Sequence, residues 1–132
     1  MQSGFSFVRA ALALALLAAA TGCATVDGAQ AASRRRVEYG LASFYGSEFE
    51  GRLTASGERY NPRKLTAAHR TLPLGSHARV TNLENHRSIV VRINDRGPHR
   101  EGRIIDLSQR AARDLGFVGV GVTRVRVQAL RR

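Results

Sequence analysis

Cysteine is almost absent from this sequence. Cys23 is the single cysteine among 132 residues, so no disulfide can form within the chain. The four histidines are scattered, and none has cysteine partners at the spacing of a zinc site. We therefore expect no metal and no cofactor.

Lysine and acidic residues are also scarce. Lys64 is the only lysine, and 21 lysines and arginines together oppose 10 aspartates and glutamates, which gives a formal net charge of +11. A surface this basic implies an anionic partner. Nucleic acid is one such partner, but the sequence lacks the aromatic runs of RNA-binding motifs and the ligand spacing of zinc fingers.

The beginning of the chain has the layout of a secretory signal. Arg9 precedes an apolar run over residues 10–20, and small residues follow before Cys23. The run is too short for a stable transmembrane helix. The segment predicts export, which argues further against nucleic acid and favours the carboxylates of the cell wall as the anionic partner.

The residues "ATGC" that end at Cys23 resemble the lipobox of bacterial lipoproteins, with Ala20 where leucine is usual. The resemblance implies removal of residues 1–22 and lipid on Cys23, and several acyl chains would give firm anchoring. Ala24, rather than aspartate, then implies the periplasmic face of the outer membrane. Residues 23–36 are small and polar and end in three arginines, so we expect a flexible tether. The alternative is a plain signal peptide that leaves a free thiol.

Residues 37–132 are predicted to form one small, mainly β domain. Runs of β-forming residues recur along it, and a hairpin signal over residues 85–87 separates two of them. The runs cover residues 37–46, 77–84, 87–95, 102–108 and 121–130. In the last run, Val125 and Val127 alternate with arginines, which is typical of a strand with one face in water.

One segment, "SQRAARDLG", has a helical pattern. Ser108 is a good N-cap, and Gly116 is a good C-terminal stop. Ala111, Ala112 and Leu115 would share one face of the helix. Six or seven short strands with one short helix before the last strand indicate a small β-barrel.

Four segments in order now carry a specific pattern: "GLASFYG", "GRLTASGERYNPRKLTAAHRTLPLG", "VRINDRGP" and "GRIIDLSQRAA". Together they resemble the rare lipoprotein A (RlpA) family of septal lytic transglycosylases, over about residues 39–130. The resemblance implies a six-stranded double-psi β-barrel. It also implies endolytic cleavage of peptidoglycan glycan strands stripped of stem peptides. In that reaction the muramic acid's own 6-hydroxyl attacks its anomeric carbon, which leaves a 1,6-anhydro ring.

Such a reaction needs a proton for the leaving oxygen and stabilisation of an oxocarbenium-like centre, and one acid–base group can suffice. The resemblance implies that Glu58, His69, Asp95 and Asp106 supply this chemistry. Each has a structural alternative. Glu58 can be an exposed loop residue and His69 a buried hydrogen-bonding residue, Asp95 can cap a turn, and Asp106 can favour the following helix. A glutamate that donates a proton near neutral pH would need a raised pKa.

Further residues are candidates for substrate binding. Asn61 stands where the family usually has aspartate, and an amide can hydrogen-bond but cannot transfer a proton as a carboxyl does. Tyr45 and Tyr60 can lie against sugar faces or pack in the core. Arg96 is one of several arginines that can meet the lactyl carboxylate of muramic acid. The others are Arg52, Arg59, Arg92 and Arg103.

The sequence therefore predicts a lytic transglycosylase with a role in cell-wall remodelling and daughter-cell separation. Its partners would be peptidoglycan glycan strands and, through Cys23, a membrane; we expect a monomer. Many relatives carry a C-terminal sporulation-related repeat, whereas this sequence ends after the last predicted strand, so we expect the barrel alone to hold the glycan. The alternative function is expansin-like binding of peptidoglycan without cleavage.

Overall fold

The computed structural model describes residues 36–130. The expected signal peptide over residues 1–22 and the lipidated Cys23 lie outside the described residues, as does nearly all of the expected tether over residues 23–36. Within the described range, no helix has the length and apolar character needed to cross a membrane.

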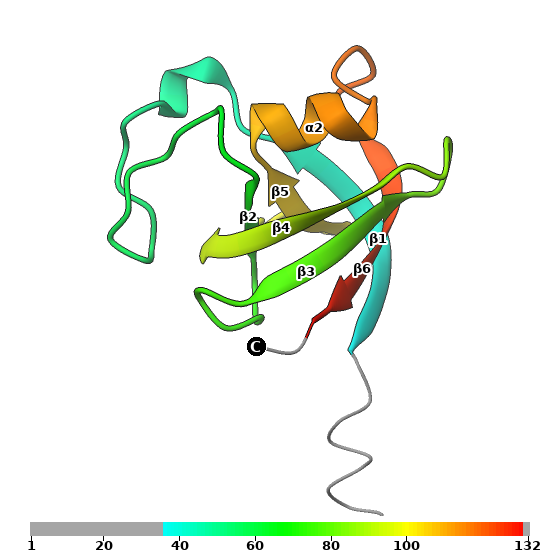
Figure 1. Ribbon diagram of the computed structural model, residues 1–132, viewed down its shortest axis with the longest axis horizontal. Coiled ribbons are helices and arrows are strands. Elements are labelled where there is room, and N and C mark those ends of the chain that lie inside the picture. The colour runs from blue at the N-terminus through cyan, green and yellow to red at the C-terminus, as the bar shows by residue number, and fades with distance from the viewer. Residues whose placement is uncertain (1–35, 131–132) are drawn as a thin grey trace, which may run out of the picture. The chain divides into compact units, whose positions relative to one another are not determined.

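Six strands form a closed barrel in the order β1-β5-β2-β4-β3-β6 (Figure 1). Two neighbouring pairs, β1 with β5 and β2 with β4, are parallel, and the other four are antiparallel. The strands are β1 (Val37–Phe44), β2 (Thr66–His69), β3 (His77–Asn82), β4 (Ser88–Asp95), β5 (Arg103–Leu107) and β6 (Thr123–Ala129). The predicted six-stranded β-barrel is thus confirmed.

The barrel core follows the alternation of apolar residues along the strands. In β6, Val125 and Val127 are buried while Arg124 is exposed, as predicted. Because side chains alternate between the two faces of a strand, this pattern places one face of β6 in the core. The predicted hairpin is also present, since β3 and β4 pair with each other in antiparallel register.

Helix α2 (Gln109–Leu115) follows β5 and precedes β6 in the sequence, and it packs against the barrel (Figure 1). The Ser108 hydroxyl accepts a hydrogen bond from the amide of Ala111, which satisfies one of the free N–H groups at the helix start. Gly116 ends the helix with φ 76°, a left-handed conformation that glycine adopts without steric cost. Ala111, Ala112 and Leu115 are buried, so the predicted helix and both of its ends are confirmed.

Two irregular features of the backbone lie close to the candidate site. The pairing of β2 with β4 shifts register between Ala67 and Ala68, so that Asn94 is an extra residue on β4. A bulge of this kind bends a strand and redirects its side chains. The long segment over residues 45–65 contains a 3-10 turn, η1 (Ser47–Phe49), and an isolated bridge between Leu53 and Arg59. Neither feature is indicated by the sequence pattern.

Candidate active site

A groove of about 510 Å³ lies beside the ends of β1 and β4 and the beginning of β5. Its wall contains two carboxylates, Asp95 and Asp106, together with aromatic and basic side chains. The other lining residues are Phe44, Tyr45, Phe49, Arg96, Gly97, Pro98, His99, Arg100 and Arg103. Five of the residues proposed from the sequence therefore line the same groove: Asp95, Asp106, Tyr45, Arg96 and Arg103.

The barrel register explains why the two aspartates meet here. Ala68 of β2 pairs with Asp95 on one side and with Asp106 on the other. Directly paired residues point to the same face of a sheet, and neighbouring strands lie about 4.8 Å apart. Asp95 and Asp106 are therefore two strand spacings apart, about 10 Å between backbones. The bulge at Asn94 sets this alignment, because without the extra residue Asp95 would not pair with Ala68.

Asp95 is held by three hydrogen-bond donors. Its Oδ2 accepts from the hydroxyl of Tyr45 at 2.7 Å. Its Oδ1 accepts from the backbone amides of Ala55 at 2.9 Å and of Arg96 at 2.8 Å. The turn-capping role and the groove position proposed from the sequence thus occur together. All three donors are uncharged, which leaves this carboxylate oriented without a cation bonded to it among residues 36–130.

Asp106 has a charged partner. Its Oδ1 accepts a hydrogen bond from the Ser43 hydroxyl, and the same oxygen lies 3.5 Å from Nη2 of Arg103. Arg103 also donates to the Ser43 hydroxyl, so the three side chains form one cluster across β1 and β5. The Asp106 side chain is mostly buried and does not bond to the start of α2 in the structure.

Tyr45 connects Asp95 to an aromatic cluster. Its ring centroid lies 4.7 Å from that of Tyr60 and 5.6 Å from that of Phe49. The pKa of Tyr45 is raised far above its usual value, first by burial and then by its bond to Asp95, with a further contribution from Asp106. The phenol therefore remains protonated and acts as a permanent donor to Asp95.

Glu58 lies near the site, but it is not part of the groove wall. Its Oε1 accepts from Nη2 of Arg92 at 2.7 Å and from Nδ2 of Asn94 at 3.1 Å. The hydrogen bond from Arg92 is the main cause that holds the pKa of Glu58 below its usual value. Its side chain is 29% exposed. The raised pKa that a proton donor at this position would need is therefore not found here.

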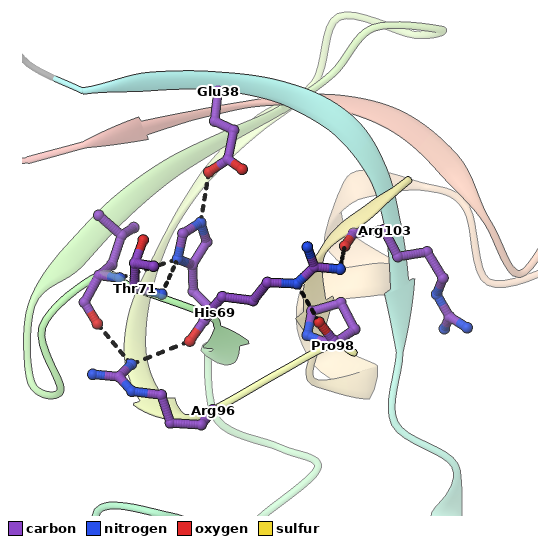
Figure 2. A network of polar contacts seen from close by, with 8 residues as sticks. Glu38, His69, Thr71, Arg96, Pro98 and Arg103 are labelled. Atoms are coloured by element: carbon purple, nitrogen blue, oxygen red, sulfur yellow. Dashed lines mark hydrogen bonds and ion pairs between the residues drawn. The ribbon is translucent and has the colours of Figure 1, made fainter. Parts of the chain in front are cut away.

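His69, at the end of β2, has both ring nitrogens occupied by the protein. Its Nδ1 accepts from the backbone amides of Thr71 and Leu72, each at 3.1 Å, so the proton is on Nε2. That nitrogen donates to Oε2 of Glu38 at 2.8 Å (Figure 2). The ring is only 2% exposed, and burial lowers the pKa of His69. His69 does not belong to the groove wall, and the geometry gives it a structural role.

The remaining proposed residues differ in position. The Oδ1 of Asn61 accepts from the amide of Arg63 at 3.0 Å, a local turn that aspartate would form equally well. Tyr60 is buried, and its hydroxyl accepts from the amide of Gln109, so its ring is not free to lie against a sugar. The guanidinium of Arg96 donates to backbone carbonyls, although the residue lines the groove.

Several groove residues were not proposed from the sequence. Phe44 and Phe49 flank Tyr45, and His99 and Arg100 follow the "DRGP" motif directly. The aromatic run "SFYG" is a signal that could have drawn attention to Phe44 and to Ser43. Nothing in the local pattern distinguishes His99 and Arg100 from solvent-exposed loop residues. Residues 36–130 contain no cluster of histidine and acidic side chains arranged to hold a metal ion.

The sequence was compared with known families and proteins. A family model described as lytic transglycolase matches residues 37–127. A protein of Nostoc sp. named "Probable endolytic peptidoglycan transglycosylase RlpA" is 59% identical over 104 residues, which are 77% of this chain and 28% of the relative. The Pasteurella multocida "Endolytic peptidoglycan transglycosylase RlpA" is 59% identical over 92 residues, 70% of this chain and 31% of the relative. The chain thus spans about a third of these relatives' length.

Solved structures agree with the fold. The Streptomyces papain inhibitor superposes with a TM-score of 0.60 at 24% identity, covering 73% of this chain and 96% of that protein. An expansin of Clavibacter michiganensis, solved in complex with cellohexaose, gives a TM-score of 0.58 at 18% identity, covering 73% of this chain and 51% of the expansin. Since the family model covers more than half of the sequence, this chain belongs to the lytic transglycolase family, with RlpA proteins as relatives and a double-psi β-barrel as its fold.

Proposed function

We propose that this protein is an endolytic lytic transglycosylase that cleaves peptidoglycan glycan strands. The proposal is supported by the family membership and by one structural observation, the groove that Asp95 and Asp106 both line from the two sides of Ala68. The bond between the anomeric carbon of N-acetylmuramic acid and the oxygen of N-acetylglucosamine breaks. The 6-hydroxyl oxygen of the same muramic acid forms the new bond, so the product is a 1,6-anhydro sugar and no water is consumed.

Asp95 is the proposed acid–base group. The other two candidate carboxylates each contact an arginine, Arg92 for Glu58 and Arg103 for Asp106, and the hydrogen bond from Arg92 is the main cause that lowers the pKa of Glu58. The three donors to Asp95 are neutral. In the proposed reaction its carboxyl gives a proton to the leaving oxygen and then receives the proton of the attacking 6-hydroxyl, which closes the proton balance.

Asp106 is the proposed anionic stabiliser. It faces the groove from β5, on the opposite side of β2 from Asp95. Its contact with Arg103 and the Ser43 hydroxyl fixes its position. A carboxylate beside the anomeric carbon lowers the free energy of the oxocarbenium-like transition state because positive charge develops there. Glu58 lies beside Asn94, but its ion pair with Arg92 offsets its negative charge.

The test is product analysis of peptide-stripped glycan strands digested with the barrel-containing protein. We expect 1,6-anhydro-muramic ends by mass spectrometry with the wild type. Asp95→Asn should abolish them, whereas Glu58→Gln should retain measurable activity. Products with only reducing ends would reject the lyase reaction, and full activity of Asp95→Asn would reject the assignment of the acid–base group.

Binding without cleavage is the second candidate function. It is favoured by the Glu58–Arg92 ion pair, because the acid in the family's "SGE" position is held ionised. Under this alternative, the protein would sediment with peptidoglycan, and the glycan strand lengths would be unchanged after prolonged incubation. Appearance of new chain ends with the wild type, absent with Asp95→Asn, would exclude it.

We further propose that the protein acts in the cell envelope, anchored by lipid on Cys23 to the periplasmic face of the outer membrane. The lipobox-like sequence supports this location. The protein is also proposed to act as a monomer. Metabolic labelling with palmitate should mark the wild type and not Cys23→Ser, and membrane fractionation should place the labelled protein in the outer membrane.

A further inference from the structure

Arg70, which follows the last residue of β2, donates to two backbone carbonyls of the loop between β4 and β5 and to one at the start of β5. Its Nε lies 2.5 Å from the oxygen of Pro98. Its Nη2 lies 2.6 Å from the oxygen of Arg100 and 3.0 Å from that of Arg103. One guanidinium therefore bonds to the loop near its beginning, at its middle and at the start of β5.

Arg96 makes the reverse connection. It belongs to the loop, and its Nη1 donates to the oxygen of His69 at 3.1 Å and to that of Leu72 at 2.7 Å. Figure 2 shows Arg96 approaching the backbone of His69 from one side, with the carbonyls of Pro98 and Arg103 on the other. The segment over residues 69–72 and the loop over residues 96–102 are thus joined by two arginines pointing in opposite directions. We call this pair the arginine clamp.

The clamp holds the loop that connects the two strands carrying Asp95 and Asp106. The loop it holds begins directly after Asp95, the last residue of β4, and ends four residues before Asp106 in β5. Gly97, Pro98, His99 and Arg100 of this loop line the groove. A shift of the loop therefore changes the shape of the groove beside the two carboxylates.

The chemistry of the clamp requires arginine. A guanidinium is planar and presents several N–H groups in a fixed fork, whereas a lysine ammonium is a point charge that is not preorganised for carbonyls in different directions. Lysine at position 70 would keep the charge but lose the simultaneous bonds to Pro98, Arg100 and Arg103. The substitution separates the bonding geometry from the charge.

His69 supports one side of the clamp. Its Nδ1 accepts from the amides of Thr71 and Leu72, which fixes the turn that presents the Leu72 carbonyl to Arg96. His69, which was proposed as a catalytic residue from the sequence, thus contacts the clamp through backbone groups, and it does not line the groove.

We propose that Arg70 and Arg96 are positioning residues that hold the 96–102 loop, so that the groove keeps its shape beside Asp95 and Asp106. Neither residue touches substrate through its guanidinium. The effect on turnover rests on the proposed function, whereas the effect on the loop does not. The arginine clamp therefore predicts two independent results.

The first result concerns the loop itself. The Arg103 amide donates to the Arg100 oxygen at 3.2 Å, and Arg70 holds that same oxygen. In Arg70→Ala and Arg70→Lys, we expect hydrogen exchange at the Arg103 amide, followed by NMR, to accelerate about tenfold or more because local opening becomes easier. The Val80 amide in the β3 ladder is the internal reference and should not change.

Arg79→Ala is the matched control. Arg79 is an exposed arginine on β3, and its side chain has no hydrogen-bond partner among the residues described. This variant removes the same charge without touching the loop, so Arg103 exchange should remain at the wild-type rate. Unchanged exchange in both Arg70 variants would overturn the clamp, whether or not the protein cleaves glycan.

The second result concerns turnover. In Arg70→Ala and Arg96→Ala we expect kcat on stripped glycan to fall by about tenfold to a hundredfold, with KM within about threefold of the wild type. Guanidinium ion at millimolar concentration should restore part of kcat in Arg70→Ala, and methylammonium should not. The double variant should lose less than the product of the two single losses, because the two arginines act on one loop.

The two results separate the possible failures. An inactive wild type would reject the proposed function, while the exchange of the Arg103 amide would still decide whether the clamp exists. Faster exchange with an unchanged kcat would reject the positioning role. A loss confined to KM would instead mean that these arginines bind the glycan, which would also overturn the proposal.

Discussion

The hydroxyl of Tyr45 is a single polar group, and its removal tests whether it orients Asp95 in the groove. It donates to Oδ2 of Asp95 at 2.7 Å. Tyr45→Phe deletes this bond and keeps the ring, which packs against Tyr60 and Phe49. The two backbone amides that bind Oδ1 remain, so Asp95 keeps its place in the turn but loses the donor that orients its second oxygen.

The size of the effect follows from the type of bond. A hydrogen bond to a charged group contributes about 1.5–3 kcal/mol to stability, and this one is only partly buried, so we expect the free energy of unfolding to fall by about 1–2 kcal/mol. Turnover depends on the orientation of Asp95 as well. Loss of about 1.4 kcal/mol of transition-state stabilisation is a tenfold fall in rate, so we expect kcat to fall by about tenfold.

Tyr39→Phe is the matched control for this substitution. Tyr39 lies on β1, is 65% exposed, and its hydroxyl has no partner among residues 36–130. The same oxygen is removed there without touching the groove. Urea unfolding followed by circular dichroism and release of anhydro ends from stripped glycan give the two measurements. Equal stability and equal turnover in both variants would refute the role assigned to the Tyr45 hydroxyl.

Three further predictions follow. Arg92 lowers the pKa of Glu58, so the ion pair stabilises the fold above pH 4.5, the usual pKa of glutamate, and this stabilisation is lost as the pH falls below that value. Glu58→Gln should therefore reduce the pH-dependent part of the unfolding free energy by at most about 1 kcal/mol, measured by urea unfolding between pH 3 and 6. Burial lowers the pKa of His69, so the neutral ring stabilises the fold fully above pH 6.5, and this contribution declines as the pH falls through the lowered pKa. His69→Gln should make the unfolding free energy depend less steeply on pH in this range. An unchanged pH dependence would contradict the structural role of His69. Asn61→Asp should keep the hydrogen bond from the Arg63 amide and change the free energy of unfolding by less than about 0.5 kcal/mol. The yield of anhydro ends should equal that of the wild type, and a higher yield would contradict the role of Asn61 as a turn residue.

The strands and the helix could be predicted because their signals are local. Alternation in β6, the hairpin between β3 and β4, and the two ends of α2 each depend on residues close in the sequence. Ser108 and Gly116 show this most clearly, since each acts on backbone groups within a few positions. The barrel topology came from the family resemblance, because the strand count alone does not specify the order of the strands.

The chemistry of the site was harder to predict because it depends on distant partners. The pKa of Glu58 is set by Arg92, 34 residues away in the sequence, and no local pattern reveals this pairing. The placement of Asp95 opposite Ala68 depends on the bulge at Asn94, which one extra residue creates in an otherwise regular strand. A motif therefore identifies which side chains are candidates, whereas the register and the ion pairs determine what each can do.

The arginines show how composition and structure lead to different conclusions. The net charge of +11 suggests a surface suited to an anionic polymer. Near the groove, however, Arg70 and Arg96 donate to backbone carbonyls, while Arg92 and Arg103 contact carboxylates. Because backbone carbonyls in loops need donors and lysine lacks the forked geometry, arginine is the side chain suited to this end of the barrel. Part of the positive charge therefore stabilises the groove itself. Arg70 and Arg96 keep their charge because backbone carbonyls are uncharged, whereas the charges of Arg92 and Arg103 are partly offset by carboxylates.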